Sequence, residues 1–307
     1  MSRHLLCLED LGRDGLWRVL ELAEAAELEP LLEGRSVGLF FEHPSARTRN
    51  AFEAAVFQLG GHPVSIRAEE IGIDSRETAE DVARTLACFH SVIGGRVGAH
   101  STLERMAAAL DKPGVAVPIV NLLSDRQHPS QAVADLLTLR AHLGELRGTT
   151  LAYVGDHNNV SRSLVVAGAF VGMRVNLASP PGYAMGGAEL AWARSLGGEV
   201  QLFAQPAEAV AGADAVYTDV WLSMGQSDEL EARRRAFAGY GVDEALLSGA
   251  GDRAIVMHCL PAHRGEEISE ELLEGPRSVV WEQATNRMHA ARGILAYLME
   301  QHEGRAR

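Results

Sequence analysis

The sequence is almost without lysine. Among its 28 basic residues the only lysine is Lys112, in the turn-like stretch Asp111-Lys112-Pro113-Gly114. Schiff-base chemistry and the phosphate-binding loop of nucleotide hydrolases both need a lysine at a defined position. Because the neighbouring proline and glycine are typical of a solvated turn, the sequence argues against both kinds of chemistry.

Positive charge as a whole is also in deficit. The chain has 28 basic and 41 acidic residues, and its formal net charge is −13. A chain of this balance has no general affinity for nucleic acid or for an anionic membrane surface. Any group of arginines must therefore act locally, on a small anion.

Cysteine and long apolar runs are scarce too. The three cysteines, Cys7, Cys88 and Cys259, are scattered and odd in number, which argues against a disulfide framework and fits a reducing compartment. The first 15 residues lack the apolar core of a signal peptide, and no run approaches the roughly 18 apolar residues of a membrane span. We expect a cytoplasmic protein that does not cross a membrane.

What the sequence does contain is an alternation of strand and helix patterns over 307 residues, enough for two domains. We expect strands at 36–41, 115–121, 150–155, 174–178, 213–218, 254–258 and 278–281. We expect helices at 11–28, 47–59, 77–89, 102–110, 129–143, 160–172, 187–196 and 284–299. Such alternation predicts an α/β fold with two doubly wound parallel-sheet domains, 1–143 and 148–283.

The first polar junction lies in the stretch FFEHPSARTRNAFEAA, residues 40–55, where an apolar run gives way to a helical pattern. Exposed backbone N–H groups and the positive end of the helix dipole would face an anion held between Ser45 and Thr48. Arg47 adds a planar donor fork suited to phosphate. The alternative is a helix cap with solvated arginines, and the sequence leaves both open.

Two further junctions of the first half carry polar groups. Arg96 follows the apolar run of Ile93-Gly94-Gly95 and is a candidate second arginine for the same anion. Taken without the other segments, an arginine at this position is more typical of the protein surface. In Gln127-His128-Pro129-Ser130-Gln131 the proline fits a first helical turn, so His128 is the expected N-cap and lies beside Gln131. These two residues could bind a carbonyl or phosphate oxygen, or simply cap the helix.

The second half has its own junctions. The turn Gly155-Asp156-His157-Asn158-Asn159 lacks the glycines of a dinucleotide-binding loop, whereas Asn159 can both donate to and accept from an amino acid. Asp219 offers a carboxylate for an ammonium group. Ser223, Met224 and Gly225 follow it in a flexible segment that lacks the first glycine of a hydrolase nucleophile elbow.

The last junction is His258-Cys259-Leu260-Pro261-Ala262-His263. Cys259 could be a nucleophile, a zinc ligand together with His258 or His263, or a polarisable lining group. Since no C-x-x-C or H-E-x-x-H spacing supports a metal, we expect no metal. Its position after an expected strand favours a functional site over a merely buried cysteine.

Together these segments resemble the ornithine carbamoyltransferases, in the order that family shows along nearly the whole chain. Each motif is modest alone, but six in register are highly specific. They are S-x-R-T-R at 45–49, H-P-x-Q at 128–131, G-D-x-N-N at 155–159, D-x-x-x-S-M-G at 219–225, H-C-L-P at 258–261 and N-R-M-H at 286–289.

The resemblance implies a first domain that binds carbamoyl phosphate and a second that binds L-ornithine, with a final helix (284–301) that returns to the first. It implies carbamoyl transfer to the ornithine δ-amine in arginine metabolism, without cofactor or metal, in a homotrimer or a multiple of trimers. The carbamoyl phosphate residues would be Ser45, Ala46, Arg47, Thr48, Arg96, His128, Gln131, Cys259, Leu260 and Arg287. The ornithine residues would be Asn159, Asp219, Ser223 and Met224, and the catalytic groups Arg96, His128 and Cys259.

The chain departs from the family pattern in three places, of which Ser130, where the family often has cysteine, should matter little. Ala46 stands where the family usually has threonine, so one hydroxyl is absent and phosphate binding would be weaker. The loop at 69–77, which in the family usually offers a glutamine to the neighbouring subunit, here contains Glu70. A carboxylate there would be unfavourable near phosphate unless Arg76 compensates for it.

Three alternatives follow. The acceptor could be another amine such as putrescine, although Asp219 with the Ser223 segment favours an α-amino acid. The chain could be a non-catalytic paralogue that binds carbamoyl phosphate, which Ala46 and Glu70 would suit. A dehydrogenase is compatible only through fold analogy.

Overall fold

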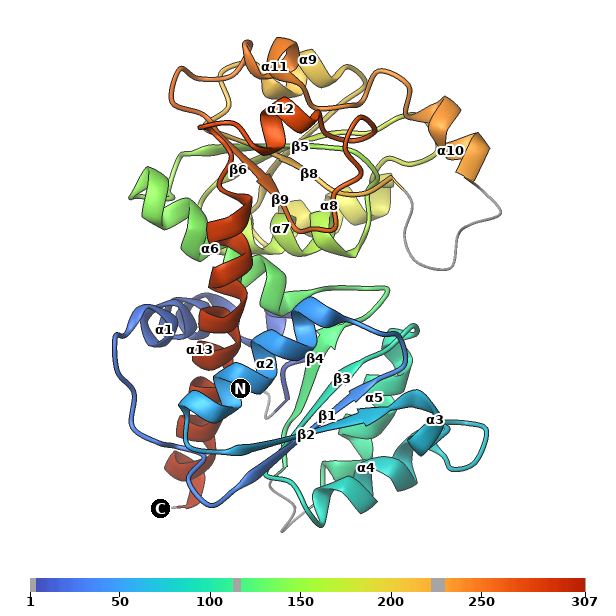
Figure 1. Cartoon of the computed structure of the whole chain (residues 1–307), viewed down its shortest axis with the longest axis vertical. Helices are drawn as coiled ribbons and strands as arrows, with labels where there is room; N and C mark the ends of the chain where they lie inside the picture. Colours follow the sequence, from blue (N-terminus) through green and yellow to red (C-terminus); the bar gives the residue numbers. More distant parts are fainter. Residues whose placement is uncertain (1–3, 113–116, 222–229, 307) are drawn as a thin grey trace. The chain divides into compact units, whose positions relative to one another are not determined.

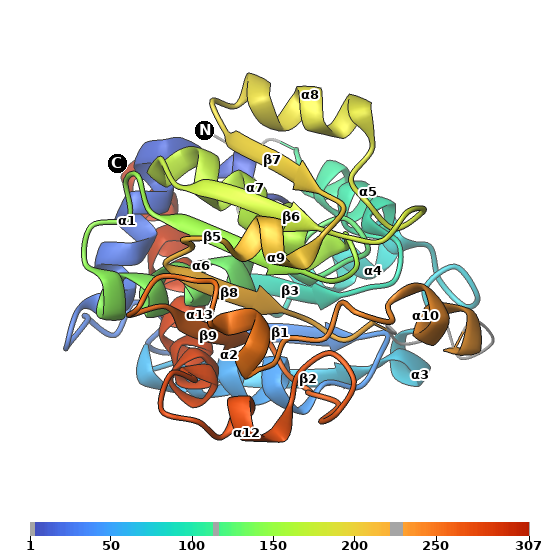
Figure 2. The same ribbon diagram turned by 90° about the horizontal axis from the view of Figure 1, so that it is seen from above.

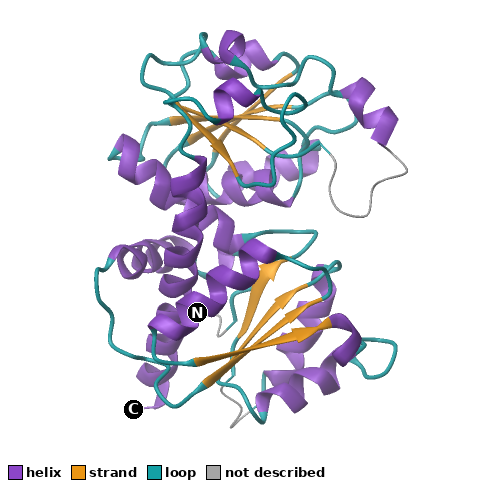
Figure 3. Ribbon diagram, in the orientation of Figure 1, coloured by secondary structure: helices purple, strands orange, loops and turns teal. Residues whose placement is uncertain are grey.

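A computed structural model describes residues 4–112, 117–221 and 230–306. The chain falls into two compact units: unit 1 comprises Met1–Ala134 with Asn286–Arg307, and unit 2 comprises Asp135–Thr285. Each has one parallel sheet with flanking helices (Figure 3), which confirms the α/β fold. The domain bounds at 143, 148 and 284 stay a prediction, because α6 (Pro129–Leu143) and α13 (Val280–Ala306) each continue across the division.

The sheet of unit 1 has the order β2-β1-β3-β4 with all strands parallel. Helices α4 and α5 lie on one face, and α2 lies on the other (Figure 1). The central strand β1 is buried along nearly its whole length, as a strand covered on both faces must be. The bounds are β1 Ser36–Phe41, α2 Ala46–Gln58, β2 His62–Arg67, α3 Ala68–Ile71, α4 Ala79–Ala87, β3 Val92–Arg96, α5 His100–Leu110 and β4 Ile119–Leu123.

The C-terminal part of α13 belongs to unit 1, where it packs on α1 (Gly12–Glu24), which follows the short helix η1 (Leu8–Asp10). A Cβ at Gly293 would lie 2.6 Å from the carbonyl oxygen of Val19, so only glycine allows this approach. Arg292 Nη2 donates to the carbonyl of Ala23 at 3.0 Å, near the C-terminus of α1. These contacts bring residues near 290 into the first unit.

The sheet of unit 2 has the order β7-β6-β5-β8-β9, again all parallel. Helices α7 and α8 cover one face, and α9, α11 and α12 cover the other (Figures 1 and 2). The bounds are β5 Thr150–Val154, α7 Asn159–Val171, β6 Arg174–Ala178, α8 Gly187–Ser195, β7 Glu199–Phe203, α9 Pro206–Val210, β8 Ala215–Thr218, α10 Leu230–Ala236, α11 Glu244–Leu247, β9 Ile255–His258 and α12 Glu270–Leu273.

Both strand orders contain a point where the chain reverses its direction of travel across the sheet. In unit 1 the chain goes from β1 to the edge strand β2 and then returns to β3 on the other side; in unit 2 it goes from β5 outward to β7 and returns to β8. Ligands bind beyond the carboxyl ends of strands at such switch points. The strand orders therefore predict ligand-binding sites at the carboxyl ends of β1 and β3 in unit 1, and of β5 and β8 in unit 2.

The expected elements differ from the structure at a few places. The predicted strand at 278–281 is wrong: Ser278 makes only an isolated bridge to Val256, and α13 begins at Val280. The edge strands β2 and β7 were not predicted, because their residues are mostly half-buried or exposed and give no clear apolar pattern. The buried strand β3 was not predicted either, because Gly94 and Gly95 weaken its strand pattern. The strand predicted at 115–121 is observed as β4 from Ile119, and residues 115 and 116 lie outside the described residues. Among the helices of the described residues, none combines the length and apolar character needed to cross a membrane.

Candidate functional site

The turn between β1 and α2 is built around a helix cap. Ser45 is the N-cap of α2, and its Oγ accepts from the backbone N–H of Thr48 at 3.3 Å. The capping interpretation is therefore correct for Ser45. Ala46 and Arg47 are exposed, and Thr48 is buried with 1% of its surface accessible. The first turn of α2 thus offers N–H groups next to a buried hydroxyl.

Arg96 ends β3, the strand across the switch point from β1. It is buried, although the sequence alone favoured a surface residue, and its Nη1 lies 3.5 Å from Thr48 Oγ1. The pairing of β3 with β4 shifts register at this residue, since Gly95 pairs with Asn121 and Arg96 with Leu123. Such irregularities often re-aim a side chain at a site. Within the described residues, Arg96 Nε has no hydrogen-bond partner.

Arg287 reaches the same hydroxyl from the C-terminal helix. Its Nη2 donates to Thr48 Oγ1 at 2.7 Å, and its Nη1 donates to Gln131 Oε1 at 2.5 Å. The same Nη2 lies 3.5 Å from His128 Nε2. Three separate segments, near residues 48, 130 and 287, therefore meet within unit 1. We call the set Thr48, Arg96, His128, Gln131 and Arg287 the arginine cluster.

The charges in the arginine cluster repel one another. Burial, followed by the charges of Arg287 and Arg47, lowers the pKa of Arg96 to about 10. The pKa of His128 is lowered well below its usual range by burial and then by Arg287, Arg96 and Arg47. His128 is therefore neutral at physiological pH. An anion with several oxygens would relieve this repulsion and satisfy the donors of the cluster.

Two other arginines of unit 1, Arg49 and Arg76, each contact a neighbouring residue. The guanidinium of Arg49 lies over the ring of Phe41, 4.8 Å from its centroid. Arg76 donates to the backbone carbonyl of Glu70, whereas the Glu70 carboxylate accepts from the N–H of Arg67 at the start of α3. The carboxylate of Glu70 thus caps its own short helix.

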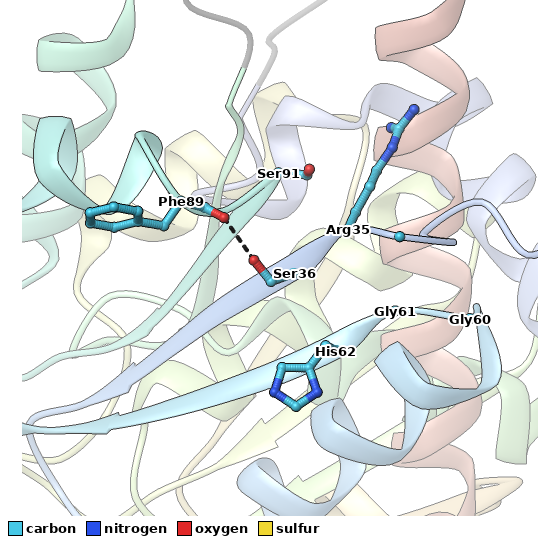
Figure 4. Close-up of a pocket in the computed structure, with 8 residues that line it drawn as sticks. Arg35, Ser36, Gly60, Gly61, His62, Phe89 and Ser91 are labelled. Atoms are coloured by element: carbon cyan, nitrogen blue, oxygen red, sulfur yellow. Dashed lines mark hydrogen bonds between the residues drawn. The ribbon is translucent and has the colours of Figure 1, made fainter.

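A pocket of about 470 Å³ opens at the opposite, amino-terminal edge of the same sheet (Figure 4). Ser36, at the start of β1, donates across it to the carbonyl of Phe89 at 2.7 Å. None of the predicted site residues is among the residues that line it: Gly34, Arg35, Ser36, Gly60, Gly61, His62, Phe89 and Ser91. The pocket is separate from the arginine cluster.

In unit 2 the ends of β5, β8 and β9 meet around Asp219. Asp219 Oδ2 accepts from Asn158 Nδ2 at 2.9 Å. Its Oδ1 accepts from the N–H of Val220 at 2.8 Å and from the thiol of Cys259 at 3.0 Å. Asp219 and Cys259 are buried. We call Asn158, Asp219 and Cys259 the aspartate cluster.

The asparagine of this cluster is Asn158, which the sequence did not single out. Asn158 is the N-cap of α7, and its Oδ1 accepts from the N–H groups of Val160 and Ser161. The predicted residue, Asn159, is the first residue of α7 and is half-buried. A capping preference for asparagine was the available signal. Ser223 and Met224 lie outside the described residues.

The surroundings of the aspartate cluster are acidic. Burial raises the pKa of Asp156, even though Arg233 Nη1 donates to its carboxylate at 2.7 Å. Burial, followed by the charge of Asp219, raises the pKa of Tyr153 well above its usual range. A buried site with this electrostatic potential favours a cationic ligand.

The interpretation of Cys259 as a zinc ligand can be weighed from its neighbours. Asp219, His258 and Cys259 each place one potential ligand atom within 4.8 Å of the others. Both ring nitrogens of His258 are already engaged, however, with the N–H of Leu260 at 2.8 Å and with Glu267 at 3.1 Å. The geometry favours Cys259 as a hydrogen-bonded lining group beside Asp219.

Comparison with known proteins gives consistent matches over nearly the whole chain. Residues 3–141 match the carbamoyl-P binding domain of aspartate/ornithine carbamoyltransferase, and residues 147–298 match its Asp/Orn binding domain. An ornithine carbamoyltransferase of Acidothermus cellulolyticus is 47% identical, with 99% of each chain covered.

Solved structures agree. The ornithine carbamoyltransferase of Pyrococcus furiosus superposes with a TM-score of 0.91 at 40% identity, covering 97% of each chain. The anabolic ornithine carbamoyltransferase of Campylobacter jejuni gives a TM-score of 0.91 at 31% identity, covering 98% of this chain and 100% of that one.

Proposed function

The chain belongs to the aspartate/ornithine carbamoyltransferase family, and we propose that it transfers the carbamoyl group of carbamoyl phosphate to the δ-amine of L-ornithine. The products are L-citrulline and phosphate. The observation that carries this proposal is the arginine cluster, in which Arg96 and Arg287 both reach the buried hydroxyl of Thr48. The guanidinium groups of these two arginines repel each other, and a doubly charged phosphate would neutralise both.

In this proposal carbamoyl phosphate binds at the first turn of α2. The backbone of Ser45 to Thr48 and the guanidinium of Arg47 hold the phosphate, since the N–H groups at a helix N-terminus and the helix dipole both favour an anion there. Arg96, His128, Gln131 and Arg287 bind the remaining phosphate and carbonyl oxygens. Neutral His128 supplies a hydrogen bond without competing for the negative charge.

L-Ornithine binds in unit 2. Asp219 receives its α-ammonium group, and Asn159, Ser223 and Met224 complete its binding site. Asn158 joins this set, because it donates to Asp219 and so orients the carboxylate. Cys259 and Leu260 line the point where the δ-amine attacks the carbamoyl carbon.

The chemistry needs no covalent enzyme intermediate. The neutral δ-amine attacks the carbonyl carbon and negative charge grows on the carbonyl oxygen. The carbon–oxygen bond to phosphate then breaks, and the proton lost by the amine leaves with the phosphate as hydrogen phosphate. Preformed donors such as Arg96 stabilise that charge, and simultaneous binding of both substrates brings the reacting atoms together. The rate should rise with pH, because an amine of this kind titrates near 10.4 when unperturbed.

A citrulline assay with purified protein tests the proposal. We expect citrulline from carbamoyl phosphate and ornithine, and little product when putrescine, lysine or aspartate replaces ornithine. A clear preference for putrescine would overturn the choice of acceptor. Binding of carbamoyl phosphate without product from any amine would instead identify a non-catalytic paralogue.

Three finer features belong to the same proposal. We propose a cytoplasmic enzyme of arginine biosynthesis, in keeping with the three scattered cysteines Cys7, Cys88 and Cys259. We also propose a homotrimer, as the family resemblance implies, which light scattering can test against the chain mass of 33.0 kDa.

A further inference from the structure

The turn that follows β9 has an unusual backbone. Leu260 adopts a φ of 59°, in the left-handed region, which is unfavourable for a bulky side chain and rare outside glycine, asparagine and aspartate. Such a conformation persists only where its surroundings impose it. The neighbouring thiol of Cys259 contacts Asp219, so the shape of this turn also decides where that thiol lies.

One hydrogen bond closes the turn on itself. The backbone N–H of Leu260 donates to Nδ1 of His258 at 2.8 Å. Because a backbone N–H can only donate, Nδ1 carries no proton, and the single ring proton is on Nε2. Nε2 lies 3.1 Å from Glu267 Oε1, to which it therefore donates. The orientation of the imidazole is thus set by a carboxylate.

That carboxylate holds both ends of the turn. Glu267 and His258 both have 0% of their surface exposed. Besides the ring of His258, Glu267 Oε1 accepts from the backbone N–H of His263. Its other oxygen, Oε2, has no hydrogen-bond partner among the described residues and lies 3.7 Å from Nδ1 of His263. Burying a carboxylate is costly when it is incompletely hydrogen-bonded, so a functional role would explain Glu267 at this position.

The backbone of His258 is held by a separate set of hydrogen bonds. The backbone N–H of His258 donates to Gln283 Oε1 at 2.9 Å, and Gln283 Nε2 donates to Asp135 Oδ1 at 2.7 Å. The start of the turn is therefore fixed by Gln283. The conformation of the turn at Cys259 and Leu260, by contrast, depends on the hydrogen bond from Leu260 N–H to the imidazole.

We infer that Glu267 is a positioning residue for carbamoyl transfer: through His258 it fixes the amide of Leu260, and with it the Cys259–Leu260 segment. This inference rests on the proposed function, in which that segment lines the reacting atoms. Without the carboxylate the imidazole of His258 loses its preferred tautomer and orientation. Leu260 can then leave the left-handed region and carry Cys259 away from Asp219.

The first test is Glu267→Gln, which keeps the size of the side chain and removes its charge. We expect kcat to fall by about tenfold or more, as misplacement of reacting groups does. The Kd of carbamoyl phosphate should stay within about twofold, because the residues proposed to hold its phosphate lie in unit 1. Glu266→Gln is the matched control: Glu266 is half-buried and pairs with Arg234 at 2.7 Å, so its kcat should stay within about twofold.

A second variant separates positioning from general stability. His258→Asn retains a side-chain acceptor for the N–H two residues ahead, as asparagine does in turns, but cannot reach Glu267. We expect its kcat to lie above that of His258→Ala. In the His258→Asn background, Glu267→Gln should cause no further loss of kcat, which is the signature of two residues acting as one unit.

Hydrogen exchange gives a readout that is independent of activity. In Glu267→Gln the amides of Leu260 and His263 should exchange faster than in the wild type, while peptides of unit 1 exchange at the same rate. The inference is overturned if folded Glu267→Gln retains kcat within about twofold, or if these amides keep their wild-type protection. If Glu267→Gln does not fold, the comparison of His258→Asn with His258→Ala decides, and equal kcat values for those two overturn it.

Failure of the proposed function can be distinguished from failure of the positioning role of Glu267. If the wild-type protein forms no citrulline, that function is wrong, whatever the exchange data show. If the wild type is active and the Glu267 variants behave like the Glu266 control, only the positioning role is wrong.

Discussion

The arginine cluster of unit 1 and the aspartate cluster of unit 2 are built alike but carry opposite charge. Each lies at the switch point of a parallel sheet, and each is centred on a buried side chain, Thr48 or Asp219. In unit 1 the neighbouring charges that lower the pKa of buried Arg96 are those of other arginines. In unit 2 burial and the charge of Asp219 raise the pKa of Tyr153.

Opposite charge in the two clusters provides a way for one chain to bind two different substrates. The arginine cluster brings like charges together, whereas the carboxylate of the aspartate cluster already accepts three hydrogen bonds; each can receive a ligand of the opposite charge. The donors and acceptors are already in place, so little reorganisation is needed on binding. In the proposed function, the sign of the charge selects the substrate of each unit: a phosphate in unit 1 and an ammonium group in unit 2.

The largest effect is expected where the arginine cluster loses a cation. Arg96→Ala should weaken carbamoyl phosphate binding by about 100-fold, since charge-assisted hydrogen bonds contribute up to about 3 kcal/mol each. The free energy of unfolding without ligand should change little, because relief of repulsion offsets lost packing. Calorimetry and urea unfolding measure the two quantities. Arg18→Ala, which removes an exposed ion pair with Glu300, is the control, and unchanged affinity in Arg96→Ala would refute the role of the cluster.

A smaller effect, on the other substrate, is expected in the aspartate cluster. Asp219→Asn should raise the KM for ornithine by roughly 10- to 100-fold, because the ammonium group loses its counter-charge. The affinity for carbamoyl phosphate should be unchanged. Asp243→Asn, at the N-cap of α11, serves as the control for the loss of a carboxylate from unit 2. Equal KM values for both variants would show that Asp219 does not bind ornithine.

The free energy of unfolding should depend on pH through His128 of the arginine cluster. The folded-state pKa of His128 is lowered by burial and neighbouring arginines, so below about pH 6.5 the unfolded chain takes up a proton that folded His128 does not. This term is absent at about pH 7.5 and lowers the free energy of unfolding by about 1 kcal/mol near pH 5.5. His128→Asn should remove this part of the decrease in urea unfolding. His62→Asn, at an exposed position, should not, and an identical pH dependence for His128→Asn and the wild type would contradict the assignment.

The smallest effect concerns the missing hydroxyl of the phosphate turn. Ala46→Thr places a donor at the exposed first residue of α2. One added hydrogen bond of about 1 kcal/mol should tighten carbamoyl phosphate binding by roughly fivefold. Ala46→Val adds similar bulk without the hydroxyl and separates hydrogen bonding from packing. Equal affinity for the two variants would show that position 46 acts through its backbone alone.

Much of the fold followed from local patterns. The bounds of β1, β6 and α6 agree with the predicted ranges, because β1 and β6 are almost continuously buried runs and α6 lies between Pro129, which suits a first helical turn, and Gly144. The edge strands β2 and β7 were missed for the opposite reason, since half of their environment is solvent. The predicted strand at 278–281 failed because an apolar stretch of that length also fits the start of a buried helix.

The chemical groups at the junctions between strands and helices could be identified from the sequence alone. They include the arginines around Thr48 and the carboxylate of Asp219, and the near-absence of lysine argued against lysine chemistry. Only the tertiary structure decided which of them meet. Arg287 reaches Thr48 across a sequence separation of 239 residues, and Asn158 reaches Asp219 across a separation of 61 residues. The physical reason is that periodicity records local hydrogen bonding and burial, whereas contacts between distant segments depend on how helices and strands pack.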